Sequence, residues 1–510
     1  MSNRFSLGKM KSIDTTTGPI GKQLILFTIP LLISNFLQQL YSTIDMVILG
    51  NYGTDKALAA TGTTVALTNI LLGLFVGIST GASVVVAQAY GAHDNKKVYR
   101  AVHSTIFLGF ASGAILMIIG LIFAPNLLEL IDVPEELLDL STLYMRVTFA
   151  GMIPLGVYNM SSAILRAIGD STRPLIFLII SSVINIILDL VFVAGLKLNI
   201  FGAALATVIA QIISAGLALY VLTHANDVYR VYWRDIKFYK EISKRILAIG
   251  LPAGIQSAVI SGSNTIIQAR VNSFGAHAIE GYAAANKIDG YFFMCVNSFS
   301  ISATTFVGQN IGAKKYKRAK KGIKIDLALG IGISILLAVI LGIFRVPLLS
   351  IFNIAKESYK FGLFMVTMDC FTYWIFAIGD VLSGAYRGAG KSIFPMVAAL
   401  VNMFVIRIIW VNLVAKIHPS FGLTLLAYPI SWTFQALTMI VYYFSAKWLR
   451  DKNIEAFEAK AAEKKEKAKF IMNVLAEDEK AQKQGLKRYK DPNVYIDEHT
   501  DQSIYVDIDK

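Results

Sequence analysis

Long apolar stretches alternate with short polar ones along most of the chain. Each stretch approaches or exceeds the roughly 20 residues that an α-helix needs to cross a bilayer. By this length criterion we predict membrane spans at residues 24–49, 58–86, 102–124, 138–160, 174–195, 202–222, 246–272, 281–308, 325–345, 360–384, 394–415 and 422–446. The pattern therefore predicts an all-α integral membrane protein with about twelve transmembrane helices.

The chain also contains an internal repeat, in which short motifs recur about 221 positions later. The matched pairs are Gln88-Ala-Tyr-Gly91 and Gln309-Asn-Ile-Gly312, Arg166-Ala-Ile-Gly169 and Arg387-Gly-Ala-Gly390, and Pro30 and Pro252. Each copy holds about six spans, an even number, so the second copy enters the membrane from the same side as the first. We therefore predict two parallel six-helix bundles related by a pseudo-two-fold axis along the membrane normal.

The repeat defines the expected domains. They are a cytoplasmic N-terminus over residues 1–23, an N-terminal bundle over 24–223, a cytoplasmic linker over 224–245, a C-terminal bundle over 246–446 and a charged cytoplasmic tail over 447–510. The tail is rich in Ala, Glu and Lys as far as Gly485, which predicts a solvated helix. After Asp491 its composition predicts disorder.

Composition and charge agree with a membrane protein. Hydrophobic residues make up 55% of the chain and charged residues only 16%, against roughly 25% charged residues in soluble domains. The formal net charge is +14, and basic residues concentrate in alternate connections, such as residues 230–245 and 314–321. The positive-inside rule then places both termini in the cytoplasm. The charge indicates membrane topology, and we expect no nucleic-acid partner.

Ionisable residues within membrane spans are costly and typical of functional sites. Asp45 lies near the end of the first span, and Asn185 and Asp189 lie one helical turn apart on one face of the fifth. A buried carboxyl group can exchange a proton, and the nearby amide can hydrogen-bond it or help to ligate a hard cation. We therefore predict ion coupling at these three residues, with a proton or a sodium ion.

The cleft expected between two such bundles is the candidate substrate site. The residues predicted to line it are Asn35, Gln38, Tyr41, Gln256, Asn264, Lys287, Asp289 and Met294. Lys287 and Asp289 lie two positions apart in one span and do not face each other, so each needs another partner or a wet cavity. For any single residue of this set, packing between helices is the alternative.

Other repeated residues are expected to shape the backbone. Pro30 and Pro252 each remove a helical hydrogen bond and are predicted to be hinges, with a fixed kink as the alternative. Arg166 and Arg387, with the glycines that follow them, are predicted to shape cytoplasmic loops.

These motifs together resemble the multidrug and toxic compound extrusion (MATE) family, in its bacterial MepA-like and DinF-like branch. The resemblance covers about residues 20–446. It is carried by the repeated Gln-x-x-Gly-Ala motif, the repeated Arg-x-x-Gly-(x)4-Pro motif and Ile44-Asp45-Met-Val-Ile-Leu-Gly50. It implies a V-shaped pair of bundles in the bacterial cytoplasmic membrane that exports cationic and aromatic amphipaths by antiport with protons or sodium ions.

The resemblance also implies roles for individual residues. Asp45, Asn185 and Asp189 match an ion-binding site in the N-terminal bundle, Asn159 and Thr207 match the polar ring around it, and Pro30 matches a bend that responds to protonation. The sodium-type branch carries an acid deep in the seventh span, where this chain has Gln256 and Asn264. We therefore favour proton over sodium coupling, and expect no cofactor besides the ion gradient.

Two alternatives remain open. A lipid-linked precursor flippase of the same broad superfamily would carry an arginine-rich cleft, but the predicted spans hold few arginines, among them Arg146, Arg270 and Arg407. A membrane enzyme would need a second acidic motif or a histidine cluster, and the sequence offers neither. Cys295 and Cys370 form no metal or disulfide pattern. We expect a transporter without catalytic activity, with small organic cations or amphipaths and membrane lipids as partners. A monomer suffices, because one chain holds both halves.

Overall fold

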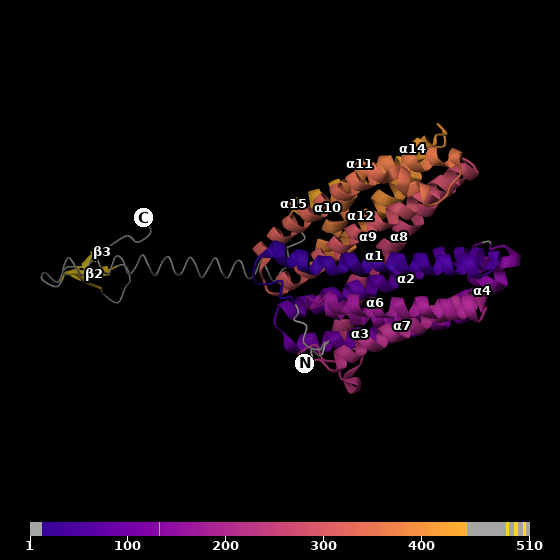
Figure 1. Ribbon diagram of the computed structural model, residues 1–510. Helices are drawn as coiled ribbons and strands as arrows, with labels where there is room; N and C mark the ends of the chain where they lie inside the picture. The colour runs from indigo at the N-terminus through magenta and orange to yellow at the C-terminus, as the bar shows by residue number, and fades with distance from the viewer. Residues whose placement is uncertain (1–12, 132, 446–485, 489–493, 498–502, 506–510) are drawn as a thin grey trace, which may run out of the picture. The chain divides into compact units, whose positions relative to one another are not determined.

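The computed structural model describes residues 13–131, 133–445, 486–488, 494–497 and 503–505 (Figure 1). It divides into two units, Met1–Ser445 and Ala446–Lys510. The first unit contains all the predicted membrane spans but the last residue of the final one.

Helices make up nearly all of the first unit. The first half holds α1 (Ile20–Tyr52), α2 (Asp55–Gly91), α3 (Asn95–Glu129), α4 (Glu135–Ala150), α5 (Met152–Ala167), α6 (Thr172–Asp189), its π-helical extension η2 (Leu190–Gly195) and α7 (Asn199–Thr223). A short 3-10 helix, η3 (Trp233–Asp235), follows. The second half holds α8 (Lys240–Asn272), α9 (Ala276–Gly312), α10 (Tyr316–Ser350), α11 (Lys356–Gly388), the consecutive turns α12 (Ile393–Ala399), η4 (Leu400–Val405), α13 (Ile406–Ile409) and η5 (Trp410–Val414), and finally α14 (Phe421–Leu425) and α15 (Ala427–Phe444).

The predicted membrane fold is confirmed, with a difference in the number of spans. Within the described residues, 10 helices are long and apolar enough to cross a membrane, or 11 if α4 and α5, which bend by 46° at Gly151, form one span. Helix α9 falls outside this set because Asn297, Ser300 and Thr304 lower its hydropathy. Each of the twelve predicted stretches nevertheless falls on one helix or on a run of consecutive helical elements.

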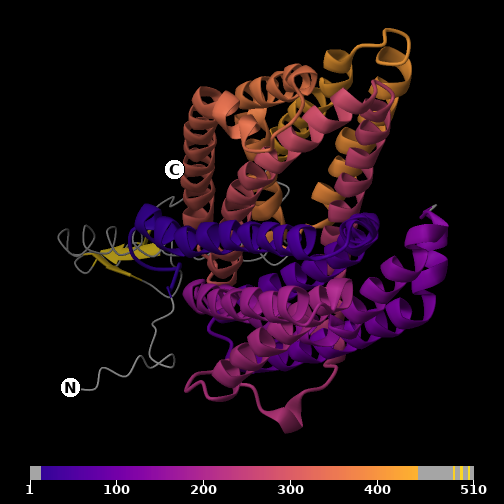
Figure 2. The same ribbon diagram turned by 45° about the vertical axis from the view of Figure 1, so that its right-hand side comes forward.

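The two halves form two bundles, which Figures 1 and 2 show as an indigo-to-magenta group and a pink-to-orange group. In the first bundle α3 packs against α4 and α5, and α7 packs against α5 and α6. In the second, α11 packs against α9, α10 and α15. Each bundle has a hydrophobic core of its own, although the first core also takes in Ile246 and Ile249 of α8.

Helices α2 and α8 join the bundles through glycines. A Cβ on Gly77 would lie 2.2 Å from the backbone nitrogen of Gly254, and a Cβ on Gly81 would lie 2.3 Å from the carbonyl oxygen of Ile246. The two backbones therefore touch directly, as small residues four positions apart allow in membrane helices. Pro252 lies within α8 at this crossing.

Two glutamines of the repeat tie the bundles together at one end. Gln88 Nε2 of α2 donates a hydrogen bond to the Gly388 carbonyl at 2.8 Å. Gln309 Nε2 of α9 donates to the Ala167 carbonyl at 2.7 Å. The two contacts correspond to each other under the pseudo-two-fold, because each glutamine reaches the residue after the repeated arginine of the other bundle.

Two glycines make the same contact close enough to exclude any side chain. A Cβ on Gly91 would lie 2.0 Å from the Gln309 carbonyl oxygen, and a Cβ on Gly312 would lie 2.0 Å from the Gln88 carbonyl oxygen. We call this contact the sealed end. It lies next to the basic connections that follow α2 and α9, since Gly91 and Gly312 are the last residues of those helices.

Residues 13–18, the N-terminal strap, cross between the bundles at the sealed end. The Ile13 amide donates to the Gly169 carbonyl of the first bundle at 3.2 Å. The Thr15 amide and hydroxyl donate to Gln309 Oε1 of the second bundle at 3.1 and 2.6 Å. Arg318 Nε donates to the Thr15 carbonyl at 3.0 Å. The strap therefore holds the two bundles together in this conformation.

Asp14 folds the strap locally. Its carboxylate accepts hydrogen bonds from the Thr16 amide at 2.8 Å and the Thr16 hydroxyl at 2.7 Å. Burial by itself raises the pKa of Asp14, but the hydrogen bonds from Thr16 and Thr17 and the charge of Lys315 outweigh it and lower the pKa overall. The carboxylate therefore stays ionised near neutral pH.

The second unit contains a small antiparallel sheet of β1 (Leu486–Arg488), β2 (Val494–Asp497) and β3 (Ser503–Tyr505), in the order β1-β2-β3. Tyr495 pairs with Arg488 on one side and Ile504 on the other. The disorder expected after Asp491 is therefore wrong for β2 and β3, whose β-branched and aromatic residues favour strands. The helix predicted up to Gly485 lies outside the described residues.

Candidate functional site

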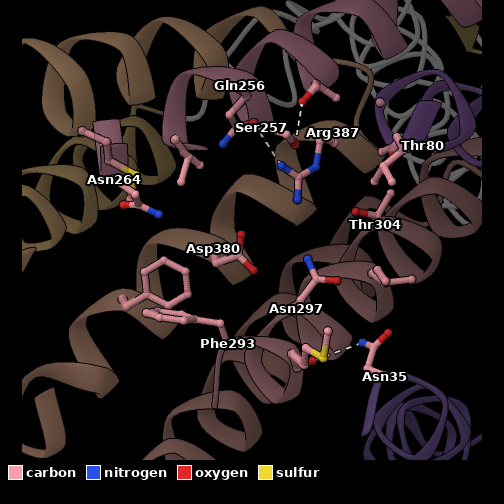
Figure 3. Close-up of a pocket in the computed structure, with 18 of the residues that line it drawn as sticks. Asn35, Thr80, Gln256, Ser257, Asn264, Phe293, Asn297, Thr304, Asp380 and Arg387 are labelled. Atoms are coloured by element: carbon pink, nitrogen blue, oxygen red, sulfur yellow. Dashed lines mark hydrogen bonds between the residues drawn. The ribbon is translucent and has the colours of Figure 1, made fainter. Parts of the chain in front are cut away.

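A cavity of about 610 Å³ lies between the two bundles, within the range of about 300–1,000 Å³ typical of ligand sites. Both bundles line it, mainly from α1, α2, α5, α8, α9 and α11. Figure 3 labels ten of its residues: Asn35, Thr80, Gln256, Ser257, Asn264, Phe293, Asn297, Thr304, Asp380 and Arg387. In Figure 1 the bundles converge toward the strap and diverge toward α4 and α14.

Most of the residues predicted for the cleft line this cavity. They are Asn35, Gln38, Gln256, Asn264, Asp289 and Met294. Asn35 of α1 crosses to α9, where its Nδ2 donates to the Met294 carbonyl at 3.1 Å and to Ser298 Oγ at 2.8 Å. The polar positions of the first and seventh spans therefore meet at one surface.

Tyr41 and Lys287 are corrections, because neither is among the residues that line the cavity. Tyr41 lies on a different side of α1 from Gln38. Its hydroxyl donates a hydrogen bond to Thr207 Oγ1 of α7 at 3.4 Å. Lys287 is exposed on α9, about 200° round the helix from Asp289. Both residues were predicted for the cleft because they are polar, but their positions around the helix axis place them away from the cavity.

The acids predicted for ion coupling come together within the first bundle. The carboxyl groups of Asp45 on α1 and Asp189 at the end of α6 face each other, and Thr207 of α7 lies beside Asp45. Asp189 is 1% exposed. Apart from the contact between these two carboxyl groups, neither carboxylate oxygen of Asp189 has a hydrogen-bond partner among the described residues.

Asn185 is fully buried one turn before Asp189, and its amide oxygen and nitrogen also have no hydrogen-bond partner in the described part of the chain. Asn159 lies elsewhere: it lines the main cavity, to which neither Asp45 nor Asp189 contributes, and donates to the Leu155 carbonyl at 2.9 Å. The polar ring expected around the acids therefore includes Thr207, whereas the placement of Asn159 there is a correction.

This cluster fits a proton or a monovalent cation. Buried polar atoms rarely go without partners, because each carries a desolvation cost. Two carboxylates, the amide of Asn185 and the hydroxyl of Thr207 supply hard oxygen ligands suited to such a cation. In the described residues there is no group of three or more His, Cys, Asp or Glu that could hold a metal ion.

The second bundle contains a carboxyl pair that sequence spacing did not reveal. Asp289 of α9 accepts a hydrogen bond from the hydroxyl of Tyr373 on α11. It also lies beside Asp369, which is on α11 as well. Both acids line the cavity and are at most 2% exposed. The ring of Phe292 stacks on Tyr373 at 3.6 Å between centroids. The two acids are 80 positions apart in the sequence, so only the tertiary contact brings them together.

Arg407 is a buried cation in the wall of the same cavity and is 1% exposed. Its Nε donates to Ser431 Oγ at 2.9 Å, and its Nη1 donates to Ser263 Oγ and Asn264 Oδ1, both at 2.7 Å. The guanidinium also lies 4.7 Å from the centre of the Tyr428 ring. This side chain therefore links α8, α13 and α15.

We expect Arg407→Ala to destabilise the second bundle by about 2–4 kcal/mol, because it removes three hydrogen bonds and leaves buried hydroxyls without a donor. Thermal unfolding of the purified protein in detergent measures the effect. Arg146→Ala is the matched control, since Arg146 is exposed on α4. Equal melting temperatures for the two variants would contradict a structural role for Arg407.

Arg166 and Arg387 also line the cavity, although the repeated motif predicted a role in cytoplasmic loops. The reason is helix length. Helix α5 continues to Ala167 and α11 to Gly388, beyond the apolar runs that ended near residues 160 and 384, so both arginines still lie on helices that face the space between the bundles.

Comparison with known proteins places the chain among transporters. The MatE family profile matches residues 30–191 and 252–412, one stretch in each half of the chain. The "Probable multidrug resistance protein YoeA" of Bacillus subtilis (strain 168) is 30% identical over 388 residues, which cover 75% of this chain and 84% of that protein. The "Multidrug export protein MepA" of Staphylococcus aureus (strain MSSA476) is 23% identical over 408 residues, covering 80% of this chain and 89% of that protein. A solved structure described as "Outward-facing conformation of a multidrug resistance MATE family transporter of the MOP superfamily" shares the fold with a TM-score of 0.79 at 19% identity, covering 85% of this chain and 97% of that one.

Proposed function

Because the chain belongs to the MATE family of transporters, we propose that it exports cationic or aromatic amphipathic drugs or metabolites across the bacterial cytoplasmic membrane by antiport with an ion. The observation that carries this proposal is the ligand-sized cavity between two bundles, closed at one end by their reciprocal contacts. The names of the relatives YoeA and MepA support drugs as the substrate class.

The transport cycle that we propose is alternating access. The sealed end adjoins the connections rich in Lys and Arg, which the positive-inside rule assigns to the cytoplasm together with both termini. The conformation described here then faces outward. An ion binds at Asp45 and Asp189, the first span shifts around Pro30, the substrate leaves to the outside, and the cleft reopens inward and releases the ion. Pro252 is the proposed hinge of the second bundle.

We favour the proton as the coupling ion and keep sodium as the alternative. In α8, where a sodium-type acid is expected, the cavity is lined by Gln256 and Asn264. The carboxyl pairs Asp45–Asp189 and Asp289–Asp369 both accept protons without needing a complete coordination shell. The gradient drives transport, so neither a resident cofactor nor a catalytic step is part of the proposal, and one chain carries the complete pathway.

A lipid-linked precursor flippase is the second candidate. The observation that favours it is the presence of three arginines, Arg166, Arg387 and Arg407, in the cavity wall, because guanidinium groups bind phosphates well. The drug-resistance names of the relatives weigh against it.

Everted membrane vesicles test these alternatives. We expect a fluorescent cationic amphipath, when added to vesicles that hold a proton gradient, to dissipate part of that gradient only when the protein is present. Flux that needs sodium and ignores the proton gradient would keep export and overturn proton coupling. If no cationic dye moves under either gradient, the flippase replaces the exporter.

A further inference from the structure

The linker between α7 and α8, residues 224–239, packs along α3 of the first bundle. The Tyr232 amide donates a hydrogen bond to His103 Nε2 at 3.0 Å. One helical turn further along α3, the ring of Phe107 meets the ring of Phe238 at 5.9 Å between centroids. The linker therefore follows α3 from near its start toward the membrane interior.

Two residues of α3 are specific to this contact. Tyr99 donates a hydrogen bond to Asp235 Oδ2 of the linker, and His103 accepts the one from the linker backbone. The equivalent positions of the internal repeat, 221 residues later on α10, carry Lys320 and Lys324, and both lysines are exposed. Tyr99 and His103 therefore belong to the linker contact and not to the repeated architecture.

The side of α3 that carries the linker faces the lipid. Ile118 and Ile122 are 52% and 59% exposed, and they lie about 20° and 60° round the helix from Phe107. Large apolar side chains exposed on a membrane span contact the hydrocarbon of the bilayer. Phe107 itself lies inside the predicted span 102–124, whereas Tyr99 precedes it. The linker therefore lies where α3 passes from the headgroup region into the hydrocarbon.

Three cations gather at this part of the linker. The Arg100 guanidinium lies 5.9 Å and the Lys237 ammonium 5.1 Å from the centre of the Tyr239 ring, so one ring positions both cations. Arg234 is exposed between them in the linker. Within the described ranges, no ion pair includes any of the three. Their positive charge is therefore available to an anionic partner.

Two large apolar rings are exposed next to these cations. Trp233, 59% exposed, precedes Arg234 in the chain, and Phe238, 44% exposed, follows Lys237. Trp and basic residues are typical of the interface between bilayer and water, where the ring is buried and the charge stays near the headgroups. A soluble anion would pair with the cations but leave both rings in water, whereas a phospholipid accommodates the charges and the rings together.

We propose that Arg100, Arg234 and Lys237 bind the phosphate of an anionic phospholipid, while Trp233 and Phe238 enter the interface of the same leaflet. The linker is then a lipid-binding anchor of the first bundle, separate from the transport cavity. It adjoins the sealed end, because α3 begins four residues after the last residue of α2. The positive-inside rule makes this the cytoplasmic leaflet, whose surface is negative.

Quenching of Trp233 fluorescence by brominated lipids tests the proposal on the purified full-length protein in detergent micelles. Phosphatidylglycerol or phosphatidylcholine with brominated chains is added, and the part of the quenching that is lost in Trp233→Phe reports lipid at the linker. We expect phosphatidylglycerol to quench at a lower concentration than phosphatidylcholine. The triple variant Arg100→Gln, Arg234→Gln and Lys237→Gln should lower this preference by about ten-fold or more, because each cation near an anionic headgroup adds to the affinity.

The control is the triple variant Lys356→Gln, Lys360→Gln and Lys416→Gln, which removes the same charge from exposed positions outside the linker and should keep the preference. Equal losses in both triple variants would show that net charge attracts the lipid and that the proposed site is wrong. High salt should also reduce the preference of the unmodified protein, since salt screens exposed charges. A preference that salt leaves unchanged, or equal quenching by the two lipids, would overturn headgroup recognition by these cations.

Glycerol phosphate separates a lipid from a soluble phosphate compound as the ligand. It carries the phosphate chemistry of the headgroup but no acyl chains. We expect it to leave the brominated phosphatidylglycerol bound when both are present at equal concentration, because it cannot cover Trp233 and Phe238. Displacement under that condition would assign the three cations to a soluble phosphate compound and overturn the assignment to a lipid.

Discussion

The substitution Asp189→Asn is expected to abolish ion-coupled efflux, lowering the coupled rate by at least about ten-fold while the protein remains folded. Asp189 is buried and its carboxyl group contacts that of Asp45, and apart from that contact it has no hydrogen-bond partner among the described residues. An amide of nearly the same shape can neither bind a proton nor contribute a negative charge to a cation site. Intramembrane acids in such positions are retained because they carry function. Recovery of a pH-sensitive dye in everted vesicles measures the coupling.

Three further variants make this result specific. Asp45→Asn is expected to act in the same direction, since the two carboxyl groups face each other. Asp139→Asn is the control, because Asp139 is exposed on α4, and it should retain full coupling. Asp289→Asn tests the second carboxyl pair. If coupling survives Asp189→Asn and is lost in Asp289→Asn, the second bundle carries the ion and the assignment to the first is wrong.

The membrane fold could be predicted because its signals are local. Apolar runs of bilayer length identify the helices, and the constant spacing between repeated motifs identifies the two halves. Ion-site residues on one helix were also accessible, since Asn185 and Asp189 lie four positions apart and share a face. Their meeting with Asp45 followed from the resemblance of the motifs to a known family.

The cavity wall was harder to predict, because it depends on helix rotation and on contacts between distant segments. Tyr41 and Lys287 are polar but face away from the cavity, and hydropathy does not report this. Asp289 and Asp369 meet only through the packing of α9 on α11. Arg166 lies beyond the apolar run that ended near residue 160, yet α5 continues past it, because helices lining a wet cavity do not end where their apolar residues end.

The contacts at the sealed end explain why the glutamine and glycine motifs occur in both halves of the chain. Gln88 and Gln309 each bind a carbonyl of the opposite bundle, and the glycines three positions later allow the two backbones to meet. A two-fold contact uses the same surface twice, so both halves must keep the same motif. The constant spacing between the repeated motifs therefore reflects one self-complementary contact between the two halves of the chain.

The substitution Gly91→Val is therefore expected to open the sealed end and to lower efflux by about ten-fold. Its Cβ would lie 2.0 Å from the Gln309 carbonyl oxygen, so the bundles must separate by more than about 1 Å, and overpacking of this kind costs about 1–3 kcal/mol. That cost falls on the conformation that the structure describes, which we propose faces outward, and it shifts the population inward. Labelling of Thr80→Cys, in a background without Cys295 and Cys370, by an impermeant maleimide from outside measures this shift, because Thr80 lines the cavity.

Gly62→Val is the matched control, since Gly62 lies on the same helix and a Cβ there meets nothing within 4 Å. We expect Gly62→Val to keep normal labelling and efflux, and Gly312→Val to reproduce Gly91→Val, because the pseudo-two-fold relates the two contacts. If Gly91→Val lowers efflux without reducing external labelling, the seal does not set the conformational equilibrium. An effect of Gly91→Val without one of Gly312→Val would mean that the two copies of the motif are equivalent in geometry but not in energy.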